Sequence, residues 1–288
     1  MSRSCVIYRQ AEFSASHRYW LPELSAAENQ ARFGATSRWP GHGHNYVLKV
    51  GISGPVDQFG MVLNLSEVKQ ILKKYVLQDL QFAYLNQVWP EFEQTLPTTE
   101  WMACVIWRRL MPHLPLVTVK LYEDPRLWAE YRGEAMRAYL TVATHFSAAH
   151  RLALDSLSLE ENTEIYGLCA RVHGHGHNYG LEVTVAGEID PRTGMIVDLA
   201  ALQEVIEQVV VKPFDHTFLN KDIEYFQRVV PTAENIALRI QELLTRPLRE
   251  LGVTLHRIAL QESPNNSAEV WGEYPLVVPD LQTVATVA

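Results

Sequence analysis

Cysteine is scarce in this sequence, and long apolar runs are missing. The three cysteines, Cys5, Cys104 and Cys169, are odd in number and widely spaced along 288 residues, which excludes a disulfide framework. The first residues contain no apolar run long enough for a signal peptide, and no segment approaches the roughly 20 apolar residues of a membrane span. We therefore expect a cytoplasmic protein that makes no contact with a membrane.

The chain also lacks an excess of basic residues. Its 25 Lys and Arg against 33 Asp and Glu give a formal net charge of -8, whereas nucleic-acid-binding domains carry a basic face. This argues against a nucleic-acid partner but leaves open a small anionic substrate. A hydrophobic content of 47% is ordinary for a globular protein, and the length allows two domains.

The dominant feature of the sequence is an internal repeat, which we identify first because a missed repeat misassigns the whole fold. Two motifs, FSASHR and GHGHNY, recur as FSAAHR and GHGHNY at an offset of 133 residues. GMVLNL and PTTE recur as GMIVDL and PTAE at an offset of 134, and KLYE pairs with ALQE at 139. The seam near residues 133–138 predicts domains at 1–134 and 138–275, followed by a tail at 276–288.

Each repeat has the order strand, strand, helix, helix, strand, strand. Residues 179–188 alternate and are rich in Val and Thr, as in a strand. Apolar residues recur at helical spacing in 198–212 and 232–246, and 254–262 return to strand composition. This order predicts two α+β domains, each an antiparallel four-stranded sheet with two helices between its hairpins.

Each repeat carries three histidines in the pattern of a catalytic metal site. Residues two apart in a strand point to one face, and a third histidine lies about one hairpin upstream. Three imidazoles with an open fourth position are typical of catalytic zinc. The two sets are His150, His175 and His177 in the second repeat, and His17, His42 and His44 in the first. Four histidines have no counterpart in the other repeat and are expected to be surface or structural residues: His113, His145, His173 and His256.

Residues 140–273 resemble the 6-pyruvoyl-tetrahydropterin synthase family, through HFSAAHR, CARVHGHGHNY, GEIDPRTGMIVDL, KPFDHTFLN and VVPTAENIA. Residues 5–134 resemble it more loosely. The resemblance implies the tunnelling fold, in which three such domains close a barrel and two barrels often stack. It also implies zinc-dependent conversion of 7,8-dihydroneopterin triphosphate to 6-pyruvoyl-tetrahydropterin, a lyase reaction that eliminates triphosphate.

The same resemblance implies roles for individual residues. Cys169 corresponds to the general base, and Asp215 with His216 to the pair that assists it. Glu262 corresponds to the carboxylate that binds the pterin ring, and its first-repeat counterpart is Glu123. Thr232 and Glu234 match a segment beside the pterin, although Thr232 also suits a helix cap.

The histidines that follow Cys169 can be aligned with a Cys–His-Gly-His motif in two registers. The Cys-x5-His-Gly-His register uses His175 and His177. The Cys-x3-His-Gly-His register uses His173 and His175, and resembles 6-carboxy-tetrahydropterin synthase of the queuosine route. The first repeat has Pro40 at the place of His173, which favours the first register. The alternative functions are that related synthase and a non-catalytic pterin-binding protein.

The first repeat has lost the groups assigned to proton transfer. Thr36 stands in place of Cys169, Gln81 in place of Asp215, and Phe82 in place of His216. Two interpretations remain open: a purely structural domain, or one that also binds zinc and a pterin. Because sites of this family lie between subunits, mixed barrels would spoil them. We therefore predict a trimer in which a barrel of first domains stacks on a barrel of second domains.

Overall fold

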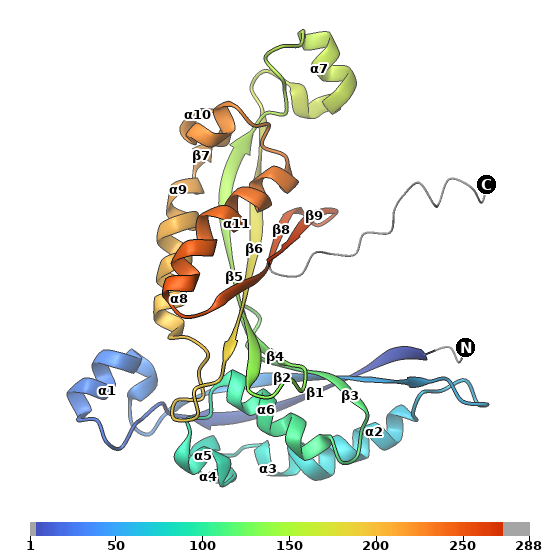
Figure 1. The fold of residues 1–288 in the computed structure, drawn as a ribbon, viewed down its shortest axis with the longest axis vertical. Helices are drawn as coiled ribbons and strands as arrows, with labels where there is room; N and C mark the ends of the chain where they lie inside the picture. The colour runs from blue at the N-terminus through green and yellow to red at the C-terminus, as the bar shows by residue number, and fades with distance from the viewer. Residues whose placement is uncertain (1–3, 273–288) are drawn as a thin grey trace. The chain divides into compact units, whose positions relative to one another are not determined.

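The structure is a computed structural model, and it describes residues 4–272 (Figure 1). Unit 1 comprises the chain up to Ala143 together with Ala186–Ala201, and unit 2 comprises Thr144–Val185 and the chain from Leu202 onward. The units therefore differ from the sequence repeats, because two segments of the second repeat pack with the first. The predicted tail at 276–288 lies outside the described residues. No helix within 4–272 is long and apolar enough to cross a membrane.

Unit 1 contains an antiparallel sheet in chain order, in which each strand pairs with the next. Its strands are β1 (Ser4–His17), β2 (His42–Pro55), β3 (Leu116–Asp124) and β4 (Leu127–Tyr131). The two main helices between the hairpins are α2 (Leu65–Leu72), which continues through a π-helical turn at Lys73–Leu77 into α3 (Gln78–Leu80), and α6 (Thr99–Leu110). Shorter helices are α1 (Ala26–Phe33), a 3-10 turn at Gly34–Ser37, α4 (Leu85–Val88) and α5 (Glu91–Gln94).

The second repeat has the same main strands and helices in the same order. Its strands are β5 (Arg137–His150), β6 (His175–Glu188), β8 (Thr254–Ser263) and β9 (Asn266–Trp271), with the two-residue β7 (Thr217–Phe218) parallel to β5. The main helices are α8 (Leu199–Ile206), a π-helical turn at Glu207–Val211, α9 (Lys212–Phe214) and α11 (Ala233–Glu250). Shorter helices are α7 (Leu159–Tyr166), a 3-10 turn at Gly167–Ala170, α10 (Leu219–Asp222) and a 3-10 turn at Glu224–Gln227. The prediction of an α+β fold is confirmed.

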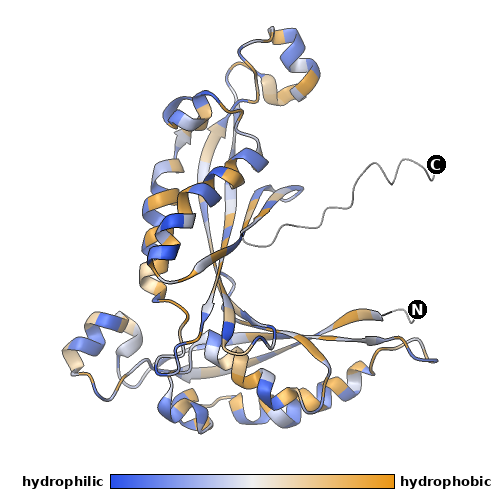
Figure 2. Ribbon diagram, in the orientation of Figure 1, coloured by the Kyte–Doolittle hydropathy of each residue, from blue (hydrophilic) through white to orange (hydrophobic). Residues whose placement is uncertain are grey.

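The core lies between each sheet and its helices. Alternate side chains of β2, from Tyr46 to Ile52, are fully buried, as the two-residue period of a strand requires. Helix α11 buries Ile236, Ile240 and Leu244 at helical spacing. Apolar and hydrophilic residues alternate along the helices, as Figure 2 shows. The apolar spacing read from the sequence therefore marks the buried faces correctly.

Strand β4 has a neighbour on both of its edges. It pairs with β3 on one side and with residues 139–142 of β5 on the other, within unit 1. Only residues 132–136 connect β4 to β5, and short connections favour antiparallel pairing of consecutive strands. The predicted assembly, a trimer in which a barrel of first domains stacks on a barrel of second domains, stays a prediction.

The loop inside each first hairpin forms a helix that the strand–strand assignment did not predict. Helix α7 begins with a capping box, in which Ser158 and Glu161 bond to each other's backbone N–H groups. Asn162 is buried, accepts a hydrogen bond from the Leu154 N–H at 2.7 Å, and donates to backbone carbonyls including that of Leu157. Asn29 does the same in the first repeat. These amides hold the segment that leads to residue 169.

Replacing Asn162 with alanine is expected to lower the free energy of unfolding by about 1–3 kcal/mol, because buried backbone groups lose their partner. Glu164→Ala, an exposed change in the same helix, is the control and should stay within about 0.5 kcal/mol. Urea denaturation measures both. An Asn162→Ala variant as stable as the control would show that water satisfies those backbone groups.

Candidate functional site

The three predicted histidines of the second repeat converge. His150 is the last residue of β5, and His175 and His177 are the first and third residues of β6. Their ligand atoms all lie within 4.8 Å of one another. Gly174 allows this approach: its φ is +64°, and a Cβ there would clash with the carbonyl oxygen of His150.

The hydrogen bond made by His150 determines which of its two ring nitrogens is available to bind a metal. Its Nδ1 donates to the carbonyl of Pro231 at 2.7 Å, so Nε2 carries the lone pair, and this atom lies 3.1 Å from Nε2 of His175. Burial, followed by the charge of nearby His175, lowers the pKa of His150 against the opposing effect of the Pro231 bond. The ring is therefore kept neutral, as a metal ligand must be.

Further electron-pair donors face the same point. Oε1 of Glu262 lies 3.7 Å from Nε2 of His150 and 3.9 Å from Nε2 of His177. The His177 Nε2 is buried and has no hydrogen-bond partner among the described residues. Converging lone pairs beside a carboxylate repel one another unless a cation lies between them. The residues therefore fit a metal ion with three imidazole ligands and an open position.

The cluster uses the later of the two histidine registers. His175 and His177 belong to it, whereas His173 lies in an exposed turn outside it. His113 and His145 are exposed as well, and His256 is buried edge-on against Trp271. These four histidines therefore lie outside both clusters, as expected from the sequence.

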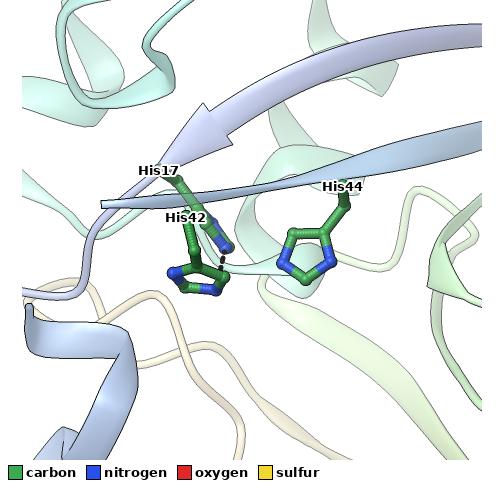
Figure 3. Close-up of side chains that lie close together, drawn as sticks. All are labelled: His17, His42 and His44. Atoms are coloured by element: carbon green, nitrogen blue, oxygen red, sulfur yellow. Dashed lines mark hydrogen bonds between the residues drawn. The ribbon is translucent and has the colours of Figure 1, made fainter. Parts of the chain in front are cut away.

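The first repeat holds a matching cluster, shown in Figure 3 with His17 on β1 and His42 and His44 on β2. Nε2 of His17 lies 3.1 Å from Nε2 of His42, and its Nδ1 lies 3.3 Å from the carbonyl of Pro97. Burial, with smaller contributions from His42 and His44, lowers the pKa of His17 to about 3. Nε2 of His44 is buried without a hydrogen-bond partner in residues 4–272. This cluster also fits a metal.

Carboxylates stand beside both clusters. Glu123 lies 3.4 Å from Nε2 of His44 and accepts a hydrogen bond from Thr99 at 2.7 Å. Burial raises the pKa of Glu123, and burial raises that of Glu100 to about 7. In the second repeat, Glu262 accepts a bond from Asn266 at 3.3 Å. The predicted pair Glu123 and Glu262 therefore occupies equivalent places next to the histidines.

Asp215 and His216 form a hydrogen-bonded pair. Nδ1 of His216 donates to Oδ2 of Asp215 at 2.7 Å, and Oδ1 of Asp215 accepts from the Ser147 N–H at 2.8 Å. The Ser147 bond first, and His216 second, lower the pKa of Asp215. The His216 side chain is 83% exposed, and its backbone has a φ of +56°. The His216 ring therefore projects into solvent while Asp215 holds its Nδ1.

Cys169 lies in the 3-10 turn after α7 and is half-buried. Its carbonyl accepts a hydrogen bond from the Leu152 N–H, and its charge acts with that of Glu262 to raise the pKa of Tyr179, after the larger effect of burial. Within residues 4–272 its side chain makes no hydrogen bond to Asp215 or His216.

The first repeat shows the substitutions at equivalent places. The Phe82 N–H bonds to the Ser14 carbonyl as the His216 N–H bonds to the Ser147 carbonyl. Both residues have a positive φ. The Thr36 carbonyl accepts the Tyr19 N–H, as the Cys169 carbonyl accepts Leu152. Phe82 and Thr36 therefore occupy the positions in the first repeat that His216 and Cys169 occupy in the second.

Two further groups at the metal cluster were not predicted. They are the carbonyl of Pro231 and the hydroxyl of Tyr179, which lie 2.7 Å and 3.3 Å from Nδ1 of His150. Both positions fall in repeated motifs, GHGHNY and PT-x-E, which was the available signal. Thr232 caps α11 by accepting the Asn235 N–H, and Glu234 is exposed. Thr232 therefore has at least the structural role that the sequence allowed.

The comparisons with known proteins agree with this architecture. The family model described as 6-pyruvoyl tetrahydropterin synthase matches residues 6–134 and again residues 139–273. The 6-pyruvoyl tetrahydrobiopterin synthase of Drosophila melanogaster is 44% identical over 139 residues, which are 48% of this chain and 82% of that protein. The Homo sapiens protein of the same name is 43% identical over 141 residues, 49% of this chain and 96% of the relative.

Among solved structures, 6-pyruvoyl tetrahydropterin synthase of Caenorhabditis elegans has 37% identity and a TM-score of 0.45, and covers 48% of this chain and 96% of its own. Each relative spans about one repeat, and the family model matches both. The predicted tandem of tunnelling-fold domains is thereby confirmed. The chain belongs to the 6-pyruvoyl tetrahydropterin synthase family and carries its domain twice.

Proposed function

We propose that the second repeat is a zinc-dependent lyase that converts 7,8-dihydroneopterin triphosphate to 6-pyruvoyl-tetrahydropterin with loss of triphosphate. The observation that carries the proposal is a difference between the repeats. Both keep three converging histidines and a carboxylate, but only the second keeps Cys169, Asp215 and His216. Selective retention of proton-transfer groups in one repeat is expected of a working site.

His150, His175 and His177 would hold zinc, which supplies polarisation of the substrate's side-chain oxygens and makes the adjacent C–H bonds more acidic. The Cys169 thiolate takes a proton from the substrate side chain. The two carboxylate oxygens of Glu262 accept hydrogen bonds from the amino and ring N–H groups of the pterin.

Asp215 and His216 are proposed to relay that proton. Asp215 orients the imidazole through its Nδ1–H and stabilises the protonated ring. Because Cys169 is not bonded to this pair within the described chain, the relay requires the pair and the thiol to come together in an assembly. Thr232 and Glu234, at the start of α11, are proposed to contact the pterin.

The first repeat is proposed to bind metal, and its Glu123 to bind a pterin without turnover. Its histidine cluster and carboxylate are equivalent to those of the second repeat. Gln81 and Phe82 cannot relay a proton, so no elimination is expected there.

Incubating the zinc-loaded protein with 7,8-dihydroneopterin triphosphate tests the reaction. We expect one triphosphate released for each 6-pyruvoyl-tetrahydropterin formed, measured by ion chromatography and by the mass of the product. A 6-carboxy-tetrahydropterin product would replace the proposal with the related synthase. Tight pterin binding without release of triphosphate would identify a binding protein instead.

A further inference from the structure

The proposed reaction releases triphosphate, an anion with several negative charges, from a chain whose own formal net charge is -8. In the elimination, the Cys169 thiolate takes the proton and the electrons of the C–H bond form a C=C bond. The C–O bond then breaks with its electron pair on the triphosphate oxygen. Arg or Lys groups that face such a departing anion stabilise it. The site therefore needs a cation besides the metal, close to Cys169.

Arg151 provides a cation at this place. It follows His150 directly, and its Nε donates to the carbonyl of Ala170 at 2.9 Å. The next residue, Leu152, donates its N–H to the carbonyl of Cys169. The guanidinium of Arg151 therefore lies beside the turn that carries Cys169, and its backbone is one residue away from a metal ligand.

The backbone of Arg151 is fixed as well. Asn220 accepts a hydrogen bond from the Arg151 N–H at 2.8 Å and donates to the Arg151 carbonyl at 2.9 Å. Within residues 4–272, the two Nη groups of Arg151 make no hydrogen bond and no ion pair. A guanidinium that is held through Nε presents its Nη–H donors in the planar geometry that phosphate oxygens accept. Arg151 is therefore oriented to bind an anion.

The first repeat has the same arginine in the same bonds. Nε of Arg18 donates to the carbonyl of Ser37 at 2.6 Å, and Asn86 bonds to its backbone on both sides. Two indole rings, however, lie over this guanidinium. Its Cζ is 3.8 Å from the ring centroid of Trp20 and 5.7 Å from that of Trp39. Because a stacked indole attracts the cation and occupies its face, the Arg18 charge is already engaged within its own repeat.

The second repeat lacks both indoles. At the repeat offset of 133, their positions are taken by Ala153 and Val172. A cavity of about 230 Å³ opens beside Ala153, and Asn220, which holds the arginine backbone, lines it as well. Its wall carries one charge of each sign, from Asp155 and Arg228. Small side chains and an open cavity therefore replace the aromatic cover of the first repeat.

A second cation lies on α10. Nζ of Lys221 is 5.2 Å from the ring centroid of Phe218. That ring packs against Gly174, directly before the histidine pair, where an added Cβ would lie 2.9 Å from it. The neighbouring Asp222 accepts the Phe218 N–H at 2.7 Å. The first repeat has the neutral Gln87 at the position of Lys221. Of the two cations, one is thus neutral and the other covered in the first repeat.

We propose that Arg151 binds the triphosphate of the substrate, with Lys221 as a second contact, and that these cations make the second repeat selective for a phosphorylated pterin. The first repeat, whose arginine is stacked and whose lysine is replaced, takes a pterin without triphosphate. This inference rests on the function proposed above, because it names the group that holds the leaving group of that reaction.

Binding of inorganic triphosphate to the zinc-loaded full chain tests this subsite separately from turnover. In isothermal titration calorimetry, Arg151→Met should raise the Kd at least about tenfold, because a charge-assisted, bidentate contact is lost. Binding of 7,8-dihydroneopterin, which carries no phosphate, should be unchanged. Arg18→Met is the matched control and should bind triphosphate as the wild type does. Metal analysis after each titration must show unchanged zinc, since triphosphate itself chelates metals.

A second variant keeps the guanidinium and its bond to Ala170. Ala153→Trp introduces the indole of the first repeat, which is expected to stack on Arg151 and to weaken triphosphate binding without changing the binding of 7,8-dihydroneopterin. Lys221→Gln, which introduces the residue of the first repeat, should weaken triphosphate binding by a smaller factor that shrinks at high salt.

Unchanged triphosphate binding in both Arg151→Met and Ala153→Trp would overturn the proposal, as would an equal loss in Arg18→Met. A matching loss of 7,8-dihydroneopterin binding in Arg151→Met would reassign Arg151 to the support of the Cys169 turn. A wild-type protein that binds triphosphate through Arg151 but releases none from the substrate would refute the proposed reaction and not the subsite. Turnover together with triphosphate binding that does not depend on Arg151 would refute the subsite and not the reaction.

Discussion

Replacing Cys169 with alanine is expected to lower kcat for triphosphate release by at least about 100-fold, the usual contribution of a positioned proton-transfer group. Within residues 4–272 the Cys169 side chain takes no part in the histidine cluster, and the bond to the Leu152 N–H is made by the backbone carbonyl of Cys169. Metal content and the free energy of unfolding should therefore be unchanged within error. The loss should fall on kcat, because pterin binding is assigned to Glu262.

The matched control is Thr36→Ala, at the equivalent turn of the first repeat. The Thr36 hydroxyl donates to the Phe33 carbonyl at 2.6 Å, so the change removes a local bond but no proposed proton-transfer group. It should leave triphosphate release unchanged. A Cys169→Ala variant with wild-type kcat would assign proton transfer to another residue, whereas equal losses in both variants would mean that the turns serve folding alone.

The candidate site was predictable from the sequence because its parts lie in short repeated motifs. His175 and His177 share a strand face by the two-residue period. The repeat offsets, 133 residues for His150 and 139 for Glu262, relate these residues to their counterparts in the first repeat. The offset also predicted that Phe82 replaces His216, and the equivalent bonds of these residues to Ser14 and Ser147 support it.

The arrangement of the repeats was not predictable in the same way. Pairing of β4 with residues 139–142, and packing of Met195 against Leu96, depend on long-range contacts that no local pattern specifies. The trimer, predicted from the presence of Gln81 and Phe82 and from the family's sites between subunits, stays a prediction. The helix in each first hairpin did have a signal, because Ser158 and Glu161 have the spacing of a capping box.

Zinc content is expected to be two ions per chain, one for each histidine cluster. His177→Ala should remove one ion and abolish triphosphate release, because an ion left with two imidazoles is held weakly and does not polarise the substrate correctly. His44→Ala should also remove one ion but leave release unchanged, since the first repeat lacks proton-transfer groups. Metal analysis after dialysis against a weak chelator, together with the triphosphate assay, measures both effects.

His173→Ala is the control for both variants, because His173 is exposed and lies outside the cluster. It should keep two ions and full activity, and a loss in this variant would reinstate the Cys-x3-His-Gly-His register. If His44→Ala lost activity as completely as His177→Ala, the first metal would be needed for the assembly or for catalysis. If the wild-type protein held only one ion and His44→Ala kept it, the first cluster would not bind metal. Its buried nitrogens without hydrogen-bond partners would then be the remnant of a former metal site.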